Sequence, residues 1–203
     1  MSTDDPRIAF FDHHAAAWDT YGPPLAETLV RLDELAPLLG LQPGWDVLEV
    51  GCGTGQVTPW LVERVCPGRV TSADFAPAMV TRARARGAAA AVHCVDVCDS
   101  DVGDALYDLV WCMHVVPHLR DHAAALRNLS RALKPGGTLL VLHLDSWQNI
   151  NAYHDQVGGA VSGDHLPDPD GWRALLPAVG LQLDAMTERD NVFLLRAHRV
   201  AGA

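Results

Sequence analysis

The spacing of apolar residues along the chain changes after about the first 40 positions. Leu25, Leu29, Leu32 and Leu35 recur three or four residues apart and are followed by Gly40. This spacing places apolar side chains on one face of a helix, and a glycine is a common helix end. The pattern predicts that the N-terminal 40 residues are helical.

Short apolar runs with the length of buried strands alternate with helical segments through the rest of the chain. The predicted strands cover 47–50, 69–74, 91–95, 109–113, 138–144, 181–186 and 191–198. One predicted helix follows a glycine-rich turn and ends at about residue 66. The others cover about 76–87, 121–133 and 172–179, and a Lys-Pro-Gly-Gly sequence ends the helix at 121–133. Strands this apolar, separated by helices, favour a parallel sheet covered on both faces. The sequence therefore predicts one doubly wound, three-layer α/β domain with a helical N-terminal cap.

Composition and charge narrow the class of partner. The chain has 203 residues, of which 49% are hydrophobic, and 25 acidic against 15 basic side chains give a formal charge of −10. A surface this acidic repels phosphate backbones, so we expect no nucleic-acid partner. The N-terminus lacks the pattern of a signal peptide, and no apolar run reaches about 18 residues, so no membrane partner is expected. The five cysteines are odd in number and lie mostly on strand-like segments, which favours a reducing, cytoplasmic location.

A glycine-rich turn follows the first predicted strand. Gly51, Gly53 and Gly55 alternate between that strand and a predicted helix, so the backbone there can approach a ligand closely. A dinucleotide-binding turn would have its third glycine at Gln56 and would hold a pyrophosphate over the turn. The carboxylate of Glu49, two residues before the turn, would repel that group and would suit a ligand with an ammonium group. The turn therefore favours a cationic nucleoside ligand over NAD or ATP.

Acidic residues also follow the second and third predicted strands. Asp74 could accept hydrogen bonds from both hydroxyls of a ribose, and Phe75 could pack against a base. Asp96 could accept from an adenine amino group, while the N–H of Val97 could donate to the ring. Each residue also has a structural interpretation: Asp74 as a helix N-cap, Phe75 as core and Asp96 as a loop residue. Their occurrence in order after successive strands favours the ligand roles.

Taken together, these motifs resemble the class I methyltransferases that depend on S-adenosylmethionine (SAM). The resemblance rests on the sequence E-V-G-C-G-T-G, the acid after strand two, C-V-D after strand three, Y-D-L-V at strand four and L-K-P-G-G before strand five. It covers about residues 44–145. Residues 10–19, F-F-D-H-H-A-A-A-W-D, also resemble the N-terminal cap of the family's small-molecule members.

The resemblance implies a seven-stranded sheet with an antiparallel last strand, and SAM as cofactor with S-adenosylhomocysteine as product. It also implies a set of cofactor-binding residues: Glu49, Gly51, Cys52, Gly53, Gly55, Asp74, Phe75, Met79, Asp96, Val97, Met113 and His114. Within one domain, residues 1–43 would form the cap, 44–145 the SAM-binding core, 146–170 a substrate-facing insert and 171–203 the C-terminal helix and strands.

Histidines are the candidate catalytic bases, because imidazole titrates near neutral pH. His114 and His118 follow strand four, His143 lies near the end of strand five, and His154 lies in the predicted insert. Methyl transfer mainly requires alignment of nucleophile, methyl and sulfur, so a base is needed only where the acceptor must lose a proton.

The segment 143–165 is dense in polar side chains. A divalent metal held by His143, Asp145, His154 and His165 is one interpretation, and a solvated lid is the other. The ligands lack the spacing typical of a metal site, which favours the lid and no metal.

The leading hypothesis is a cytoplasmic methyltransferase, monomeric or homodimeric, that acts on a small molecule. One alternative is a SAM-binding fold with other chemistry or with metal assistance. A second is a non-catalytic SAM-binding module. A dehydrogenase is disfavoured by Glu49 and Gln56.

Overall fold

The computed structural model describes residues 5–201, which fall into two compact units. One unit ends at Val95 and the other begins at Asp96. The predicted glycine turn lies in the first unit and all of the candidate catalytic histidines lie in the second.

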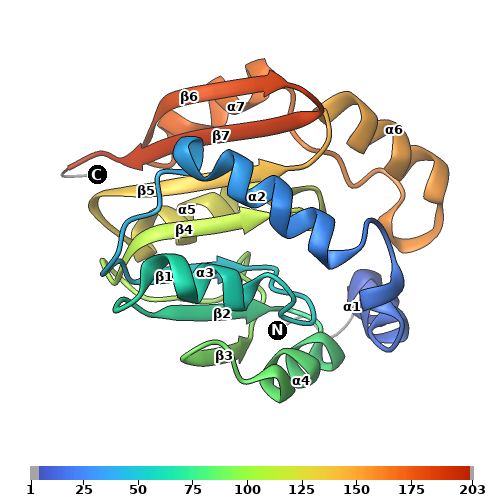
Figure 1. Ribbon diagram of the computed structural model, residues 1–203. Helices are drawn as coiled ribbons and strands as arrows, with labels where there is room; N and C mark the ends of the chain where they lie inside the picture. Colours follow the sequence, from blue (N-terminus) through green and yellow to red (C-terminus); the bar gives the residue numbers. More distant parts are fainter. Residues whose placement is uncertain (1–4, 202–203) are drawn as a thin grey trace. The chain divides into compact units, whose positions relative to one another are not determined.

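The first unit contains three parallel strands connected by helices (Figure 1). Its elements are α1 (Pro6–His14), the 3-10 helix η1 (Trp18–Thr20), α2 (Leu25–Leu39), β1 (Val47–Val50), α3 (Thr58–Val65), β2 (Val70–Asp74), α4 (Pro77–Arg86) and β3 (Ala91–Cys94). In β2, Val70 pairs with Val47 of β1 and Thr71 pairs with Ala91 of β3. Helix α1 packs beside α4, so the N-terminal segment contacts the helix that follows β2 (Figure 1).

The second unit contains four strands and most of the remaining helices. Its elements are β4 (Tyr107–Met113), η2 (Val116–His118), α5 (His122–Ala132), β5 (Leu133–His143), α6 (Trp147–Val157), η3 (Gly159–Val161), α7 (Pro169–Ala178), β6 (Leu181–Arg189) and β7 (Val192–Arg199). Strands β4 and β5 are parallel, whereas β7 runs antiparallel to both β5 and β6. The strand that ends the chain is therefore the one of opposite direction.

The strand order over the chain is β3-β2-β1-β4-β5-β7-β6 in one seven-stranded sheet. This order confirms the prediction of a Rossmann-like α/β fold with an antiparallel last strand. Central strands are apolar because both of their faces are covered: the four residues of β1 are all buried, as are Leu139–Leu142 of β5.

Local signals account for the helix boundaries. Helix α4 has Pro77 at its start and ends at Gly87, whose φ of +68° is the left-handed conformation that glycine adopts readily. Helix α5 begins after Asp121, whose side chain accepts a hydrogen bond from the N–H of Ala124. Both helices lie within one or two residues of their predicted bounds.

The predicted start of the fifth strand, at residue 138, is wrong. Strand β5 begins at Leu133, so the Lys-Pro-Gly-Gly sequence that ends α5 already belongs to the strand. Leu133 pairs with Tyr107 and Thr138 pairs with Leu109, so five positions of β5 oppose two positions of β4. The proline and glycines therefore form an irregular, bulged strand entry instead of a separate turn.

The sequence predicted no helix between residues 146 and 170, and this is also corrected; the role of the segment as a lid or insert stays a prediction. Eleven of these residues form α6, whose N-cap Ser146 accepts a hydrogen bond from the N–H of Asn149. The sequence analysis missed this helix because its many polar residues show no regular spacing of apolar positions. The serine at its N-cap was the one local signal of a helix start.

Within residues 5–201, the helices lack the combination of length and apolar character that a membrane span requires.

Candidate active site

The three glycines of the turn after β1 all adopt left-handed backbone conformations. The φ angles of Gly51, Gly53 and Gly55 are +68°, +54° and +80°. A Cβ atom on Gly55 would lie 3.2 Å from the Cα of Ala83 in α4, and one on Gly53 would lie 3.4 Å from the indole nitrogen of Trp18. Glycine is required there by backbone conformation and, at Gly55, by the close approach of α4. The turn is tightly packed on both sides.

Asp74, the last residue of β2, holds this turn in place. Its carboxylate accepts hydrogen bonds from the N–H of Gly53 at 2.9 Å and from the N–H of Ala76 at 2.9 Å. Asp74 is not the N-cap of α4, because Ala76 occupies that position without a side-chain cap. The side chain is 7% exposed and ties the end of β2 to the glycine turn. Its predicted contact with a ribose stays a prediction.

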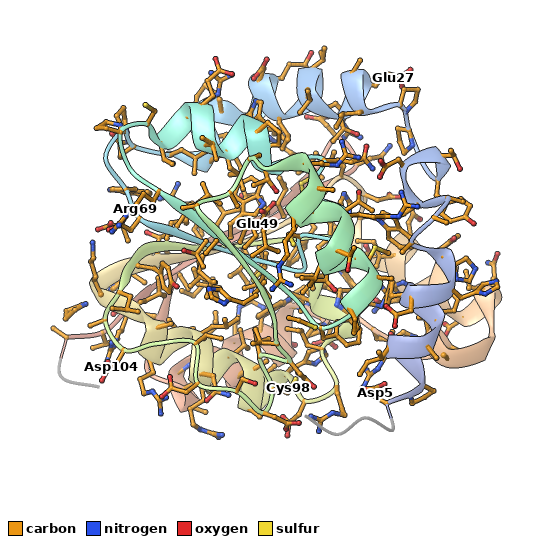
Figure 2. The ribbon with its side chains drawn as sticks, turned by 90° about the horizontal axis from the view of Figure 1, so that it is seen from below. Asp5, Glu27, Glu49, Arg69, Cys98 and Asp104 are labelled. Atoms are coloured by element: carbon orange, nitrogen blue, oxygen red, sulfur yellow. The ribbon has the colours of Figure 1, made fainter. Side chains whose placement is uncertain are left out.

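Glu49 is a buried carboxylate within β1, 3% exposed. Figure 2 shows it in the interior, whereas the labelled Glu27 and Arg69 lie at the periphery. One oxygen, Oε2, accepts hydrogen bonds from Ser72 at 2.6 Å and from Thr58 at 2.8 Å. Burial raises the pKa of Glu49 to about 7, against the smaller opposing effect of these two hydroxyl donors. Glu49 therefore titrates near neutral pH, and a nearby cation would favour its charged form.

The N-terminal cap contacts the glycine turn through Asp19. The carboxylate of Asp19 accepts hydrogen bonds from the hydroxyl of Thr54 and from the guanidinium of Arg86, which also donates to the Thr54 carbonyl at 2.7 Å. Sequence reasoning identified the cap from its W-D pattern but missed this contact and the role of Arg86. The cap is thus fastened to the segment predicted to bind the cofactor.

Aromatic side chains of the cap also reach the residue after β2. The ring of Phe75 lies 5.5 Å from that of Phe11, which lies 5.5 Å from Trp18, both pairs edge to face. Met79 in α4 is also buried. The thiol of Cys52 is itself shielded from solvent, which raises its pKa and keeps it protonated. The predicted contacts of Phe75, Met79 and Cys52 with a cofactor stay predictions.

The remaining predicted cofactor residues belong to the second unit. Asp96 accepts a hydrogen bond from the N–H of Cys98 at 2.8 Å and one from Arg120 at 3.2 Å. The carbonyl of Val97 accepts from Asn128 at 2.9 Å. Arg120 and Asn128 were missed by the sequence analysis, because no local pattern links them to a loop more than 20 residues earlier. They fix the backbone at the position predicted to meet an adenine.

His114 and His143 meet where β4 and β5 end. His114 directly follows Met113, the last residue of β4, and has a φ of +55°, an uncommon conformation for a residue with a side chain. Its N–H donates to the carbonyl of Leu142 at 3.0 Å, and its ring centroid lies 5.1 Å from that of His143. The structure confirms neither as a base, but it places the two rings side by side.

His143 is a buried neutral imidazole. The side chain is 2% exposed, and its Nε2 has no hydrogen-bond partner. Burial, followed by the nearby His114, His118 and His154, lowers the pKa of His143 well below its ordinary value. The other three candidate histidines therefore all act electrostatically on His143.

His118 and His154 form a second contact in the same unit. Nδ1 of His118 lies 2.8 Å from the carboxylate of Asp164, and its ring centroid lies 4.9 Å from that of His154. His154, on α6, is buried, and its Nδ1 has no hydrogen-bond partner. Burial, followed by the charge of His118, lowers the pKa of His154. The sequence analysis named both histidines but did not pair either with Asp164.

The structure gives two of the alternative metal ligands other partners. His165 pairs with Asp155 at 2.8 Å, and Asp145 accepts hydrogen bonds from Ser146 and Asn149. In the described part of the chain, no three His, Cys, Asp or Glu side chains are grouped so that they could hold a metal ion. The metal-assisted alternative therefore gains no support from the geometry.

Comparison with known families gives a match over the glycine turn and the strands around it. Residues 48–141 match the family model described as a methyltransferase domain. This segment contains the predicted motifs from the glycine turn to strand five.

Two curated relatives have different names. A ubiquinone biosynthesis O-methyltransferase of Xanthomonas campestris is 37% identical over 137 residues, which cover 63% of this chain and 56% of that protein. A biotin biosynthesis bifunctional protein of Bordetella avium is 30% identical over 198 residues, covering 95% of this chain and 41% of that protein. The chain thus spans about half the length of the curated relatives it matches.

Solved structures agree on the fold. The crystal structure of a SAM-dependent methyltransferase from Aquifex aeolicus matches 83% of this chain and 89% of its own, with a TM-score of 0.68 at 20% identity. Together with the domain match and the sheet order, this likeness agrees with the resemblance seen in the motifs. Residues 48–141 are thus similar to a methyltransferase domain, and the fold is that of the solved SAM-dependent methyltransferase.

Proposed function

We propose that the protein transfers the methyl group of SAM to a small-molecule acceptor. The observation that carries this proposal is the arrangement of the first unit, where Glu49 and Asp74 flank a turn of three left-handed glycines. Glu49, when ionised, supplies negative charge two residues before the turn, and the turn has no phosphate-binding lysine. This combination suits the ammonium group and the ribose of SAM better than a dinucleotide.

Methyl transfer requires the side chains only to position the reactants and, for some acceptors, to remove a proton. SAM supplies a methyl group on a positively charged sulfur, an intrinsically good leaving group. The chain's residues would bind and orient the reactants, exclude water and, for a hydroxyl acceptor, take up the proton. His114, His143, His118 and His154 are the proposed bases, supported by their grouping in the second unit.

We also propose that the acceptor is a small molecule and that the protein works in the cytoplasm as a monomer or homodimer. The formal charge of −10 argues against nucleic acid. The two relatives are named for ubiquinone and biotin biosynthesis, so likeness alone leaves the acceptor of this chain open. A single domain divided at residues 43, 145 and 170 into cap, core, insert and C-terminal segment remains part of the proposal.

The first experiment measures cofactor binding by calorimetry. We expect micromolar affinity for S-adenosylhomocysteine and roughly 100-fold weaker binding in Asp74→Ala, because two hydrogen bonds to a charged acceptor are lost. Asp74 also holds Gly53, so the 2′-deoxy analogue of the ligand separates the two roles. If Asp74 binds the ribose, the wild type prefers the hydroxylated ligand and the variant does not. The exposed Asp170→Ala is the matched control.

The second experiment distinguishes a methyltransferase from a binding module. Incubation with SAM and a set of hydroxyl, amine and thiol compounds should yield S-adenosylhomocysteine and a product heavier by one CH2. A protein that binds the cofactor but forms neither product with any acceptor would be a non-catalytic module. A mass change other than CH2 would indicate different chemistry on the same fold.

A further inference from the structure

The N-terminal segment formed by α1, η1 and the residues between them (6–20) has little buried apolar surface. Of these described residues, only Phe11 and the small Ala15 are buried. A segment that buries so few apolar side chains lies at the low end of local stability within a protein. Its attachment to the rest of the first unit therefore depends strongly on hydrogen bonds and charge.

Three side chains attach this segment to the glycine turn. The carboxylate of Asp19 accepts hydrogen bonds from the hydroxyl of Thr54 and from the guanidinium of Arg86. Nε of Arg86 also donates to the backbone carbonyl of Thr54 at 2.7 Å. Thr54 lies between Gly53 and Gly55 and is 1% exposed. The turn is thus held through both the hydroxyl and the carbonyl of its central residue.

The neighbour of Asp19 in η1 covers the turn itself. A Cβ atom on Gly53 would lie 3.4 Å from the indole nitrogen of Trp18. The absence of a side chain at Gly53 is what lets a ligand approach the backbone closely, and the indole lies on that side of the residue. A ligand that approaches Gly53 from this side meets Trp18, so Trp18 has to move away for the ligand to enter.

We propose that Asp19, Thr54 and Arg86 form a latch that controls exchange of the cofactor. The N-terminal segment closes over the ligand when the Asp19–Arg86 ion pair and the Thr54 hydrogen bond form. It opens, with both contacts broken, for SAM to enter and S-adenosylhomocysteine to leave. This inference rests on the proposed binding of SAM at the turn and adds two positioning residues, Asp19 and Arg86. Arg86 belongs to none of the motifs found in the sequence.

A latch and a contact that only shapes the turn have different kinetic consequences. If the segment is mostly closed with and without ligand, weakening the latch raises the small open fraction in both states by the same factor. Association and dissociation then become faster together, and the affinity changes little. Loss of a contact that only shapes the turn would make dissociation faster without making association faster, so the affinity would fall.

Asp19→Asn tests this difference. The variant retains an oxygen that accepts from Thr54 but removes the negative charge that faces Arg86. We expect association and dissociation of S-adenosylhomocysteine each to become about fivefold faster, the usual size for a partly exposed ion pair, with the dissociation constant within about twofold of the wild type. Stopped-flow mixing and displacement experiments measure the two rates.

Salt provides a second test that needs no substitution. S-adenosylhomocysteine carries one ammonium and one carboxylate group at neutral pH, so long-range steering of this uncharged ligand is weak. Added KCl screens the partly exposed Asp19–Arg86 pair. It should therefore accelerate both rates in the wild type and have a smaller effect in Asp19→Asn.

A second carboxylate of the first unit provides the matched control. Asp33 accepts hydrogen bonds from the indole N–H of Trp60 at 2.7 Å and from the guanidinium of Arg64. It therefore also pairs with one neutral donor and one arginine, but it joins α2 to α3 and lies outside residues 6–20. We expect Asp33→Asn to exchange S-adenosylhomocysteine at the wild-type rates.

Hydrogen exchange of the free protein tests the latch without ligand or activity. The amides of residues 6–20 should exchange faster in Asp19→Asn than in the wild type and at the wild-type rate in Asp33→Asn. Unchanged exchange in Asp19→Asn, faster dissociation alone, or tighter binding would each overturn the latch. Failure of the wild type to bind S-adenosylhomocysteine would overturn the proposed function and the latch together, whereas normal binding with any of those three results overturns the latch alone.

Discussion

Glu49 shows how burial and hydrogen bonding set the charge of one side chain. Loss of solvent disfavours its carboxylate, while the hydroxyls of Ser72 and Thr58 favour it, and burial is the larger effect. The resulting pKa of about 7 means that Glu49 is about half protonated at neutral pH before a ligand binds. A cationic ligand that requires the carboxylate must therefore displace a proton.

This linkage predicts proton release on cofactor binding. With a pKa of about 7, binding of S-adenosylhomocysteine at pH 7 should release about half a proton, rising toward one at pH 6. The affinity should fall, approaching tenfold per pH unit, as the pH drops below 7. Calorimetry in two buffers of different ionisation enthalpy measures the released proton.

The variant Glu49→Gln should bind the ligand more weakly and release no proton between pH 6 and 7. The exposed Asp170→Asn should behave as the wild type. Equal proton release in Glu49→Gln and wild type would show that another group titrates and that Glu49 does not face the ammonium group.

The sequence analysis identified side chains that belong to a motif but did not identify the residues that form hydrogen bonds with them. Glu49 and Asp74 stand out because they occupy fixed positions around a glycine turn. Ser72 and Thr58 are 23 and nine residues from Glu49 and belong to no motif, so their contacts with it arise only from the packing of β2 and α3 on β1. For the same reason Asp164, 46 residues from His118, could not be paired with it.

Helix α4 begins with help from another helix. Its own N-cap, Ala76, has no side chain that can accept a hydrogen bond. The carboxylate of Asp12 in α1 accepts instead from the N–H of Ala78, at 2.7 Å. This contact satisfies a free N–H at the helix start and places negative charge at the positive end of the α4 dipole.

We expect Asp12→Ala to lower the free energy of unfolding by about 1 kcal/mol, the usual cost of losing a cap. Asp12→Asn retains an acceptor oxygen and should lose only part of this, since the interaction with the helix dipole is removed while the hydrogen bond is kept. Urea denaturation followed by circular dichroism measures both variants. Equal stability of Asp12→Ala and the wild type would mean that solvent replaces the carboxylate at no cost.

The ends of helices and strands were predictable where a capping residue or a glycine marks the end that is observed in the fold, as for α4 and α5. They were not predictable at the start of β5, where Pro135 and two glycines are typical of a turn. There the neighbouring strand accommodates five positions of β5 opposite two of its own, and a Cβ on Gly137 would lie 2.9 Å from the carbonyl of Lys134. Helix α6 was missed because its polar residues carry no apolar period, and burial of His154 is a tertiary effect.

At the scale of the whole molecule, a change of pH is expected to change the stability of the two units in opposite directions. In the first unit, the pKa of Glu49 is raised from 4.5 to about 7, so its contribution to stability is complete below pH 4.5 and is lost as the pH rises through 7. In the second unit, the pKa values of His143 and His154 are lowered from 6.5. Their contribution is complete above pH 6.5 and is lost as the pH falls below that value, because the unfolded chain then binds protons that the fold excludes.

Lowering the pH from 7.5 to 5.5 should therefore stabilise the first unit and destabilise the second. For Glu49 the linkage amounts to roughly 1–2 kcal/mol over this interval. Hydrogen exchange resolved by peptide, corrected for the intrinsic exchange rate at each pH, measures the opening free energies of β1 and β5 separately. Protection of β1 should increase at pH 5.5 and protection of β5 should decrease. Glu49→Gln should abolish the increase in β1 alone, and His143→Asn should reduce the decrease in β5 alone. Parallel changes in both strands would show that the units open as one cooperative body whose stability reflects only the sum of the two linkages.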